Sequence, residues 1–218
     1  MYEVILFDLD GTLTDPGEGI TNSVAHALER LGRPVPPRQA LYRFIGPPLC
    51  ESFMDFCGLD RPGGLRAVEL YREYYREKGI WENQVYAGIP ELLAQLRSAG
   101  RKLLVATSKP EEFAHQILEH FHLSPYFDFV SGASMDSRRV RKADVIAPAL
   151  APEGITPGPA LVMVGDREHD VLGAREAGLD CVGVLFGYGS RAELEAAGAA
   201  KIAATVPELA RILLEVRP

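Results

Sequence analysis

The stretch VILFDLDGTLTDPGEG, residues 4–19, joins an apolar run to two closely spaced carboxylates, Asp8 and Asp10. The apolar run is typical of a buried strand. Moving a carboxylate out of water costs roughly several kcal/mol unless a positively charged group pairs with it. Either these acids are solvated at an exposed strand end, or a positively charged group lies beside them, and the rest of the sequence must distinguish the two.

Composition limits the possible classes of protein. The chain has 218 residues, 47% of them hydrophobic and 24% charged, which indicates a globular protein with a substantial core. The formal net charge of −7 disfavours binding to nucleic acid or to an anionic membrane. We expect no membrane span and no secretory signal. The odd set of Cys50, Cys57 and Cys181 has no metal-binding spacing, so we expect reduced thiols in a cytoplasmic protein.

Short apolar runs alternate with amphipathic stretches over most of the chain. Expected strands cover residues 3–8, 102–108, 127–132, 160–166, 180–187 and, more weakly, 200–205. Expected helices cover residues 90–98, 110–121, 143–150, 169–177, 191–197 and 207–216. Strands that are apolar throughout and alternate with helices predict an α/β fold, a Rossmann-like parallel sheet with helices on both faces.

Residues 15–87 interrupt that alternation. Three stretches, 19–32, 41–58 and 64–79, have helical patterns, and no convincing strand lies between them. We therefore expect two domains, an α/β core made of residues 1–14 and 88–218 and a helical cap domain made of residues 15–87.

Polar side chains follow several of the expected strands. The carboxyl ends of parallel strands meet at one edge of a sheet, where ligands collect. The residues expected there are Asp8, Asp10, Thr107, Ser108, Lys142, Asp166 and Asp170. Lys109 is a weaker candidate for the role of Lys142 and is not included.

Each of these residues also has a purely structural interpretation. Asp8 and Asp10 can be a solvated strand end, and Asp166 and Asp170 can cap a helix. Thr107 can cap the next helix, and Lys142 can belong to a solvated basic run at 138–142. The occurrence of all of them at successive strand ends favours a functional site.

Four motifs resemble the phosphatase branch of the haloacid dehalogenase superfamily. They are DLDGT (8–12), LLVAT ending at Thr107, Lys142 in VRKADVI (140–146), and GDREHD (165–170). The insertion after the first motif resembles the helical cap of the first subclass of that superfamily. Within it, residues 7–20, 44–53 and 85–96 are most similar to phosphoglycolate phosphatases and 5′-nucleotidases.

The resemblance implies a Mg²⁺-dependent phosphatase. Asp8 would be both a metal ligand and the nucleophile that forms an aspartyl-phosphate, and Asp10 would act as general acid–base and bind metal through its carbonyl. Asp166 would bind the metal directly, and Asp170 would act indirectly or through water. Thr107, Lys142 and the backbone N–H of Ser108 would hold phosphoryl oxygens.

The substrate expected from the resemblance is a small phosphorylated metabolite, with 2-phosphoglycolate first and nucleoside monophosphates second. The oligomeric state is left open as monomer or homodimer. A phosphomutase would share every motif of the core. A dehalogenase is disfavoured because Asp10 is present, and a phosphonate hydrolase because the expected cap has a single lysine, Lys78. Outside enzymes, a non-catalytic regulatory or binding protein could keep the same fold.

Overall fold

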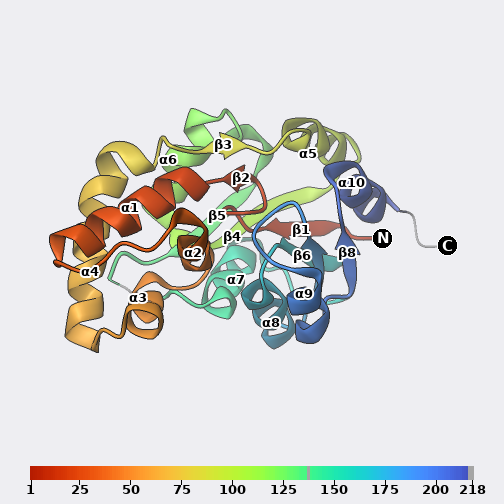
Figure 1. Cartoon of the computed structure of the whole chain (residues 1–218). Helices are drawn as coiled ribbons and strands as arrows, with labels where there is room; N and C mark the ends of the chain where they lie inside the picture. Colours follow the sequence, from red (N-terminus) through yellow and green to blue (C-terminus); the bar gives the residue numbers. More distant parts are fainter. Residues whose placement is uncertain (137, 216–218) are drawn as a thin grey trace. The chain divides into compact units, whose positions relative to one another are not determined.

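The computed structural model describes residues 1–136 and 138–215, in which the chain forms two compact units. One unit combines Met1–Thr14 with the described residues from Val85 onward, and the other is Asp15–Gln84. The chain passes between them through two short strands, β2 (Thr14–Asp15) and β3 (Gln84–Val85), which form a two-stranded sheet (Figure 1).

A six-stranded parallel sheet forms the centre of the first unit. Its order is β5-β4-β1-β6-β7-β8. The strands are β1 (Val4–Phe7), β4 (Lys102–Pro110), β5 (Phe129–Ala133), β6 (Leu161–Gly165), β7 (Asp180–Val184) and β8 (Lys201–Ala203). The expected α/β fold with a parallel sheet is confirmed. The stretch VILF is buried along its whole length because β4 and β6 flank it and helices cover both faces of the sheet.

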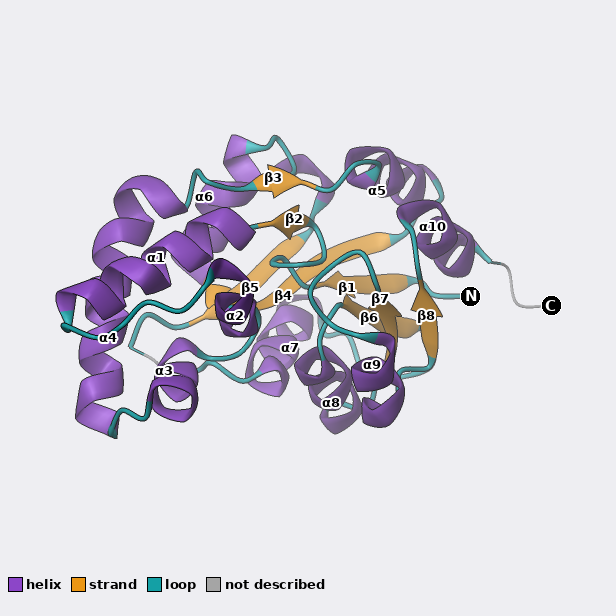
Figure 2. Ribbon diagram, viewed as in Figure 1, coloured by secondary structure: helices purple, strands orange, loops and turns teal. Residues whose placement is uncertain are grey.

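Helices cover the two faces of this sheet. They are α5 (Ile89–Ser98), α6 (Glu111–His120), α7 (Lys142–Leu150), α8 (Glu168–Glu176), α9 (Arg191–Ala197) and α10 (Val206–Leu214), with short 3₁₀ turns at Ser124–Tyr126 and Ala151–Glu153. In Figure 2, α5 and α10 lie on one side of the sheet and α7, α8 and α9 on the other. The core on the second side joins residues such as Leu6, Met163, Val145, Val171 and Leu194.

The second unit is helical. It consists of α1 (Gly17–Arg30), α2 (Arg38–Leu41), a 3₁₀ turn (Tyr42–Phe44), α3 (Leu49–Cys57), α4 (Arg61–Tyr74) and a π-helical turn (Tyr75–Gly79). The stretch 41–58, which has a helical pattern, is not one continuous helix. Gly46, with φ of +104°, and the prolines that follow it separate the 3₁₀ turn from α3. In the part of the chain that the structure describes, no helix is both long and apolar enough to cross a membrane.

Candidate active site

The carboxyl edge of the six-stranded sheet gathers the polar residues of three adjacent strands. In the central strand, Phe7 is level with Val105 of β4 and Val164 of β6. Asp8 follows β1 directly, Thr107 lies near the end of β4, and Asp166 follows β6. Two further side chains come from helix starts, since Lys142 opens α7 and Asp170 lies in the first turn of α8.

Asp8, Asp166 and Asp170 form a buried acidic cluster. Each offers a carboxylate oxygen, and these three oxygens lie within 4.8 Å of one another. The side chains are almost fully enclosed, with exposed fractions of 4%, 0% and 1% for the three residues. The backbone N–H of Tyr188 donates to Asp166 Oδ2 at 2.7 Å, whereas Asp166 Oδ1 is buried and has no hydrogen-bond partner among the described residues. Burial and the charges of Asp170 and Asp8 raise the pKa of Asp166 well above its usual value.

This cluster fits a divalent cation. Three carboxylates from separate elements converge, and one of them, Asp166, has a buried oxygen, Oδ1, without a hydrogen-bond partner among the described residues. Mg²⁺ and Ca²⁺ prefer such ligands, and a cation would oppose both the burial and the carboxylate repulsion that raise the pKa of Asp166.

Lys142 supplies the positive charge that the first motif requires. Its Nζ lies 2.7 Å from Asp8 Oδ1 and 2.7 Å from Asp170 Oδ1, and it donates to the carbonyl of Ala106 at 3.1 Å. Burial lowers the pKa of Lys142, but the facing carboxylates of Asp170 and Asp8 raise it by more, so its net shift is upward. Lys142 therefore stays protonated, and Asp8 is not a solvated strand end. Lys142 itself is 5% exposed rather than part of a solvated basic run.

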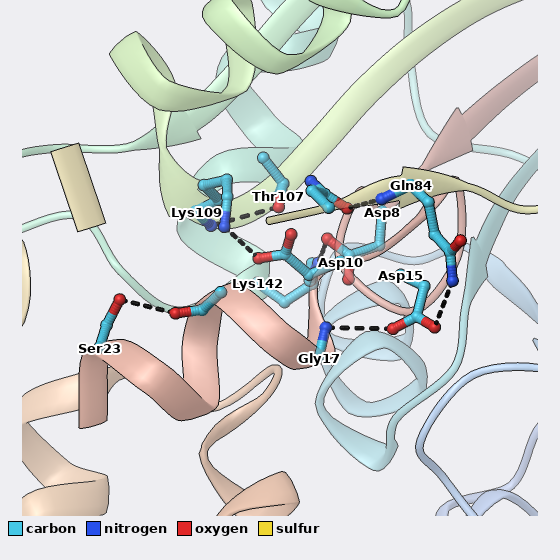
Figure 3. Close-up of polar contacts among 11 residues, drawn as sticks. Asp8, Asp10, Asp15, Gly17, Ser23, Gln84, Thr107, Lys109 and Lys142 are labelled. Atoms are coloured by element: carbon cyan, nitrogen blue, oxygen red, sulfur yellow. Dashed lines mark hydrogen bonds and ion pairs between the residues drawn. The ribbon is translucent and has the colours of Figure 1, made fainter. Parts of the chain in front are cut away.

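Asp10 pairs with a different lysine, one that the sequence predictions had left out. The Nζ of Lys109 lies 2.6 Å from Asp10 Oδ2, and the backbone N–H of Lys109 donates to Thr107 Oγ1 at 3.2 Å (Figure 3). Both side chains are enclosed, and Asp10 Oδ1 is buried without a partner in the described residues. Burial raises the pKa of Asp10, although the Lys109 ammonium partly opposes that rise.

The observed end of β4 differs from the expected one at Lys109, the weaker candidate that was not included. The expected strand ends at Ser108, whereas β4 continues to Pro110. The pairing of β4 with β5 is irregular between Ala106 and Pro110, and within this stretch Thr107 and Lys109 are buried while Ser108 between them is half-buried. Apolar periodicity does not reveal an irregularity of this kind, so the position of the Lys109 side chain could not be read from the sequence.

Two glycines leave room for the acidic cluster. Gly11 has a φ of +83°, and a Cβ built there would overlap the carboxylate of Asp166. A Cβ at Gly165 would likewise overlap the carboxylate of Asp170. The loop after β1 and the end of β6 therefore need residues without side chains for the acids to approach one another.

Comparisons with known proteins agree with this arrangement. The sequence pattern of the family described as haloacid dehalogenase-like hydrolase matches residues 5–184. A Pseudomonas aeruginosa protein named 5′-nucleotidase is 49% identical over 195 residues, covering 89% of this chain and 88% of that protein. The crystal structure of a predicted phosphatase from Clostridium acetobutylicum has a TM-score of 0.96 and 45% identity, covering 99% of this chain and 100% of that chain.

A relative with a different name is nearly as similar. The structure of protein tyrosine kinase A (PtkA) from Mycobacterium tuberculosis has a TM-score of 0.84 and 43% identity, and the match covers 99% of each chain. All three relatives match most of the present chain, and the family pattern covers the acidic cluster, Asp10, Lys109 and Lys142. The chain therefore belongs to the haloacid dehalogenase-like hydrolases.

Proposed function

We propose that this chain is a Mg²⁺-dependent phosphomonoester hydrolase that acts on a small phosphorylated metabolite through an aspartyl-phosphate. The observation that carries the proposal is the buried cluster of Asp8, Asp166 and Asp170 with Lys142 between two of its members. A phosphate monoester is doubly negative and repels nucleophiles, so its hydrolysis needs a site with positive charge beside an oxygen nucleophile.

The residues proposed to hold Mg²⁺ are the side chains of Asp8 and Asp166 and the backbone carbonyl of Asp10, with Asp170 acting indirectly or through water. When bound, the cation would neutralise phosphate charge and orient the phosphoryl group. Asp170 Oδ2 accepts a hydrogen bond from the Arg167 N–H at 3.0 Å, and its Oδ1 faces Lys142. Both oxygens of Asp170 are therefore engaged by protein groups, which supports an indirect role.

In the proposed reaction, an oxygen of Asp8 attacks phosphorus, and the bond between phosphorus and the leaving alcohol oxygen breaks. Asp10 gives its proton to that oxygen and later takes a proton from the water that cleaves the aspartyl-phosphate. Burial raises the pKa of Asp10, which favours the proton-bearing form needed at the first step. Thr107, Lys142 and the backbone N–H of Ser108 would hold the phosphoryl oxygens.

We rank the proposed substrates by the names of the similar proteins. Nucleoside 5′-monophosphates come first because the Pseudomonas aeruginosa relative is named 5′-nucleotidase. The expectation of 2-phosphoglycolate from the sequence motifs comes second, and a phosphomutase that returns the phosphoryl group to its product remains a variant of the same chemistry. The assignment of residues 15–87 as a separate cap domain, which would supply contacts to the leaving group, is also part of this proposal.

Phosphorylation of tyrosine is the second candidate function, raised by the name of the Mycobacterium tuberculosis relative. The same aspartate could pass a phosphoryl group to a phenol instead of to water. The two functions differ in donor and product. A kinase would transfer phosphate from ATP to a tyrosine hydroxyl, whereas the proposed hydrolase releases inorganic phosphate.

The test is a panel of phosphate esters, including nucleoside 5′-monophosphates and 2-phosphoglycolate, assayed with Mg²⁺ and with EDTA. Wild type should release phosphate only with metal, and Asp8→Asn should lose at least about 10⁴-fold in rate because the nucleophile is absent. Asp180→Asn is the matched control, since Asp180 is exposed at the opposite end of the sheet and should leave the rate unchanged.

Several outcomes would contradict the proposal. Turnover retained in Asp8→Asn would show that Asp8 is not the nucleophile. Steady hydrolysis in EDTA would show that the reaction needs no metal. Release of a phosphorylated isomer would favour the mutase. Labelling of a tyrosine peptide from ATP, without release of phosphate from any ester, would favour the kinase.

A further inference from the structure

Lys109 contacts two other residues of the candidate site, Asp10 and Thr107. Its ammonium group lies 2.6 Å from Asp10 Oδ2, and its backbone N–H donates to Thr107 Oγ1 at 3.2 Å (Figure 3). Asp10 lies in the loop after β1, and Thr107 belongs to β4, so Lys109 contacts both an acid beyond one strand and a hydroxyl on the neighbouring strand.

The ion pair is too buried to be a simple surface contact. The side chains of Lys109 and Asp10 are 4% and 11% exposed. Burying two charges requires good geometry, and such a pair is often no more stabilising than an apolar pair of the same volume. A role in the chemistry accounts for the pair better than a role in stability does.

The contact is also specific for one oxygen of Asp10. Lys109 engages Oδ2, whereas Oδ1 is buried and has no partner among the described residues. An ammonium group can donate to a carboxylate oxygen and, more weakly, to the carbonyl oxygen of a carboxylic acid. With Oδ2 occupied in this way, the proton of the acid form belongs on Oδ1.

We propose that Lys109 is a positioning residue that holds Asp10 with its proton-bearing oxygen, Oδ1, toward the leaving group. The inference rests on the proposed function. Lys109 also orients Thr107, because a hydroxyl oxygen that accepts the N–H of Lys109 keeps its own hydrogen free to donate to a phosphoryl oxygen.

Esters with different leaving groups separate this role from a structural one. An alkyl ester such as a nucleoside 5′-monophosphate needs a proton on its leaving oxygen, whereas p-nitrophenol leaves readily as the anion. In Lys109→Met, the first-turnover rate should fall about 100-fold for the alkyl ester, within the range of general acid catalysis, and less than about 5-fold for p-nitrophenyl phosphate. The first turnover is measured as the burst of released alcohol, which excludes the later hydrolysis step.

Matched variants complete the experiment. Met keeps the backbone N–H of residue 109, so the contact to Thr107 survives and the ammonium alone is removed. Lys109→Arg should restore most of the alkyl-ester rate because it keeps a charged donor. Lys102→Met, at the other end of the same strand, should behave as wild type toward both esters.

A double variant covers the case in which Lys109→Met does not fold. Removing both members of a buried ion pair leaves no unpaired charge. If Lys109 acts through Asp10, Asp10→Asn with Lys109→Met should have the same first-turnover rates as Asp10→Asn alone, within about 2-fold, because coupled residues are not additive.

The outcomes distinguish this inference from the proposed function. Equal losses on both esters, an unchanged alkyl-ester rate, or a further large loss in the double variant would overturn the role of Lys109 while leaving the hydrolase intact. Wild type that hydrolyses neither ester with Mg²⁺ would instead overturn the proposed function.

Discussion

The two ends of the six-stranded sheet both carry ion pairs of similar length, yet their surroundings differ. At the carboxyl edge, Lys142 Nζ lies 2.7 Å from Asp8 and from Asp170, and all three side chains are at most 6% exposed. At the amino edge, Arg97 Nη1 lies 2.6 Å from Asp128 Oδ2, with side chains 40% and 23% exposed. Contact distance therefore says little about what either pair contributes to stability.

Burial makes the difference between the two edges. An exposed pair is screened by water, so it contributes little and costs little. A buried pair has lost its hydration, so each member depends on its partner. At the carboxyl edge, removing any one charge would leave its partners buried and less fully paired. Such a set of mutually dependent buried charges is expected at a site that binds a charged ligand.

Lys142→Met should have the largest effect on stability. It leaves Asp8 and Asp170 buried without their cation, and we expect the free energy of unfolding at neutral pH to fall by about 3–5 kcal/mol. Urea denaturation followed by circular dichroism measures this. A loss of unfolding free energy below about 1 kcal/mol is the size expected for an exposed ion pair. It would show that the ion pairs at the two edges do not differ in their contribution to stability.

Gly11→Ala should cause the second-largest loss of folding stability. The new Cβ would overlap the Asp166 carboxylate, and residue 11 has a φ of +83°, so crowding and backbone strain together should cost about 2–4 kcal/mol. Gly100→Ala at the amino edge is the matched control. Its φ is +73° but a Cβ there meets nothing within 4 Å, so it should show only the strain, about 1–2 kcal/mol. Equal losses in the two variants would show that crowding against Asp166 is unimportant.

Asp166→Asn should have a smaller effect on folding stability, and in the absence of metal it should be stabilising. The folded-state pKa of Asp166 is raised, so its ionisation destabilises the fold as pH rises above the unfolded value. We expect the variant without metal to be more stable than wild type by on the order of 1 kcal/mol at pH 8, and by less at pH 5. Thermal unfolding at the two pH values tests this.

The same variant reports on the metal. Wild type should be stabilised by Mg²⁺, by about 2.7 kcal/mol at a concentration 100 times the dissociation constant, whereas Asp166→Asn should gain much less. A variant that is less stable than wild type at both pH values, or equally stabilised by Mg²⁺, would show that Asp166 is held for the fold alone.

Arg97→Met should have the smallest effect. The pair with Asp128 is partly exposed, so we expect a loss of about 0.2–1 kcal/mol that shrinks as salt is added. Urea denaturation at low and high ionic strength measures both quantities. A loss as large as that of Lys142→Met would contradict the contrast between the edges.

Much of the fold and site was predictable because the pattern is local. Each strand of the core is an apolar run next to a helical pattern, and the predicted site residues lie near strand ends or helix starts. Since parallel strands bring their carboxyl ends together, Asp8 and Asp166 could be expected to meet although they are far apart in the chain. The break at Gly46 within the stretch 41–58 was less visible, because apolar spacing continues on both sides of it.

The pairing of charges was not predictable in the same way. Asp8 and Asp10 are two residues apart, yet Asp8 faces Lys142 and Asp10 faces Lys109. Which lysine reaches which acid depends on the length of β4, on side-chain direction and on the space that Gly11 leaves.

The order of residues alone thus specifies the alternating core, the edge at which polar groups collect and the kinds of side chain present, because strand and helix periodicity are properties of neighbouring residues. Only the packed molecule decides that the acids are buried, which lysine neutralises each of them, and that one oxygen of Asp166 and one of Asp10 have no partner in the described chain. Burial and charge pairing depend on groups that are distant along the chain, and the low dielectric of the interior makes those long-range neighbours decisive.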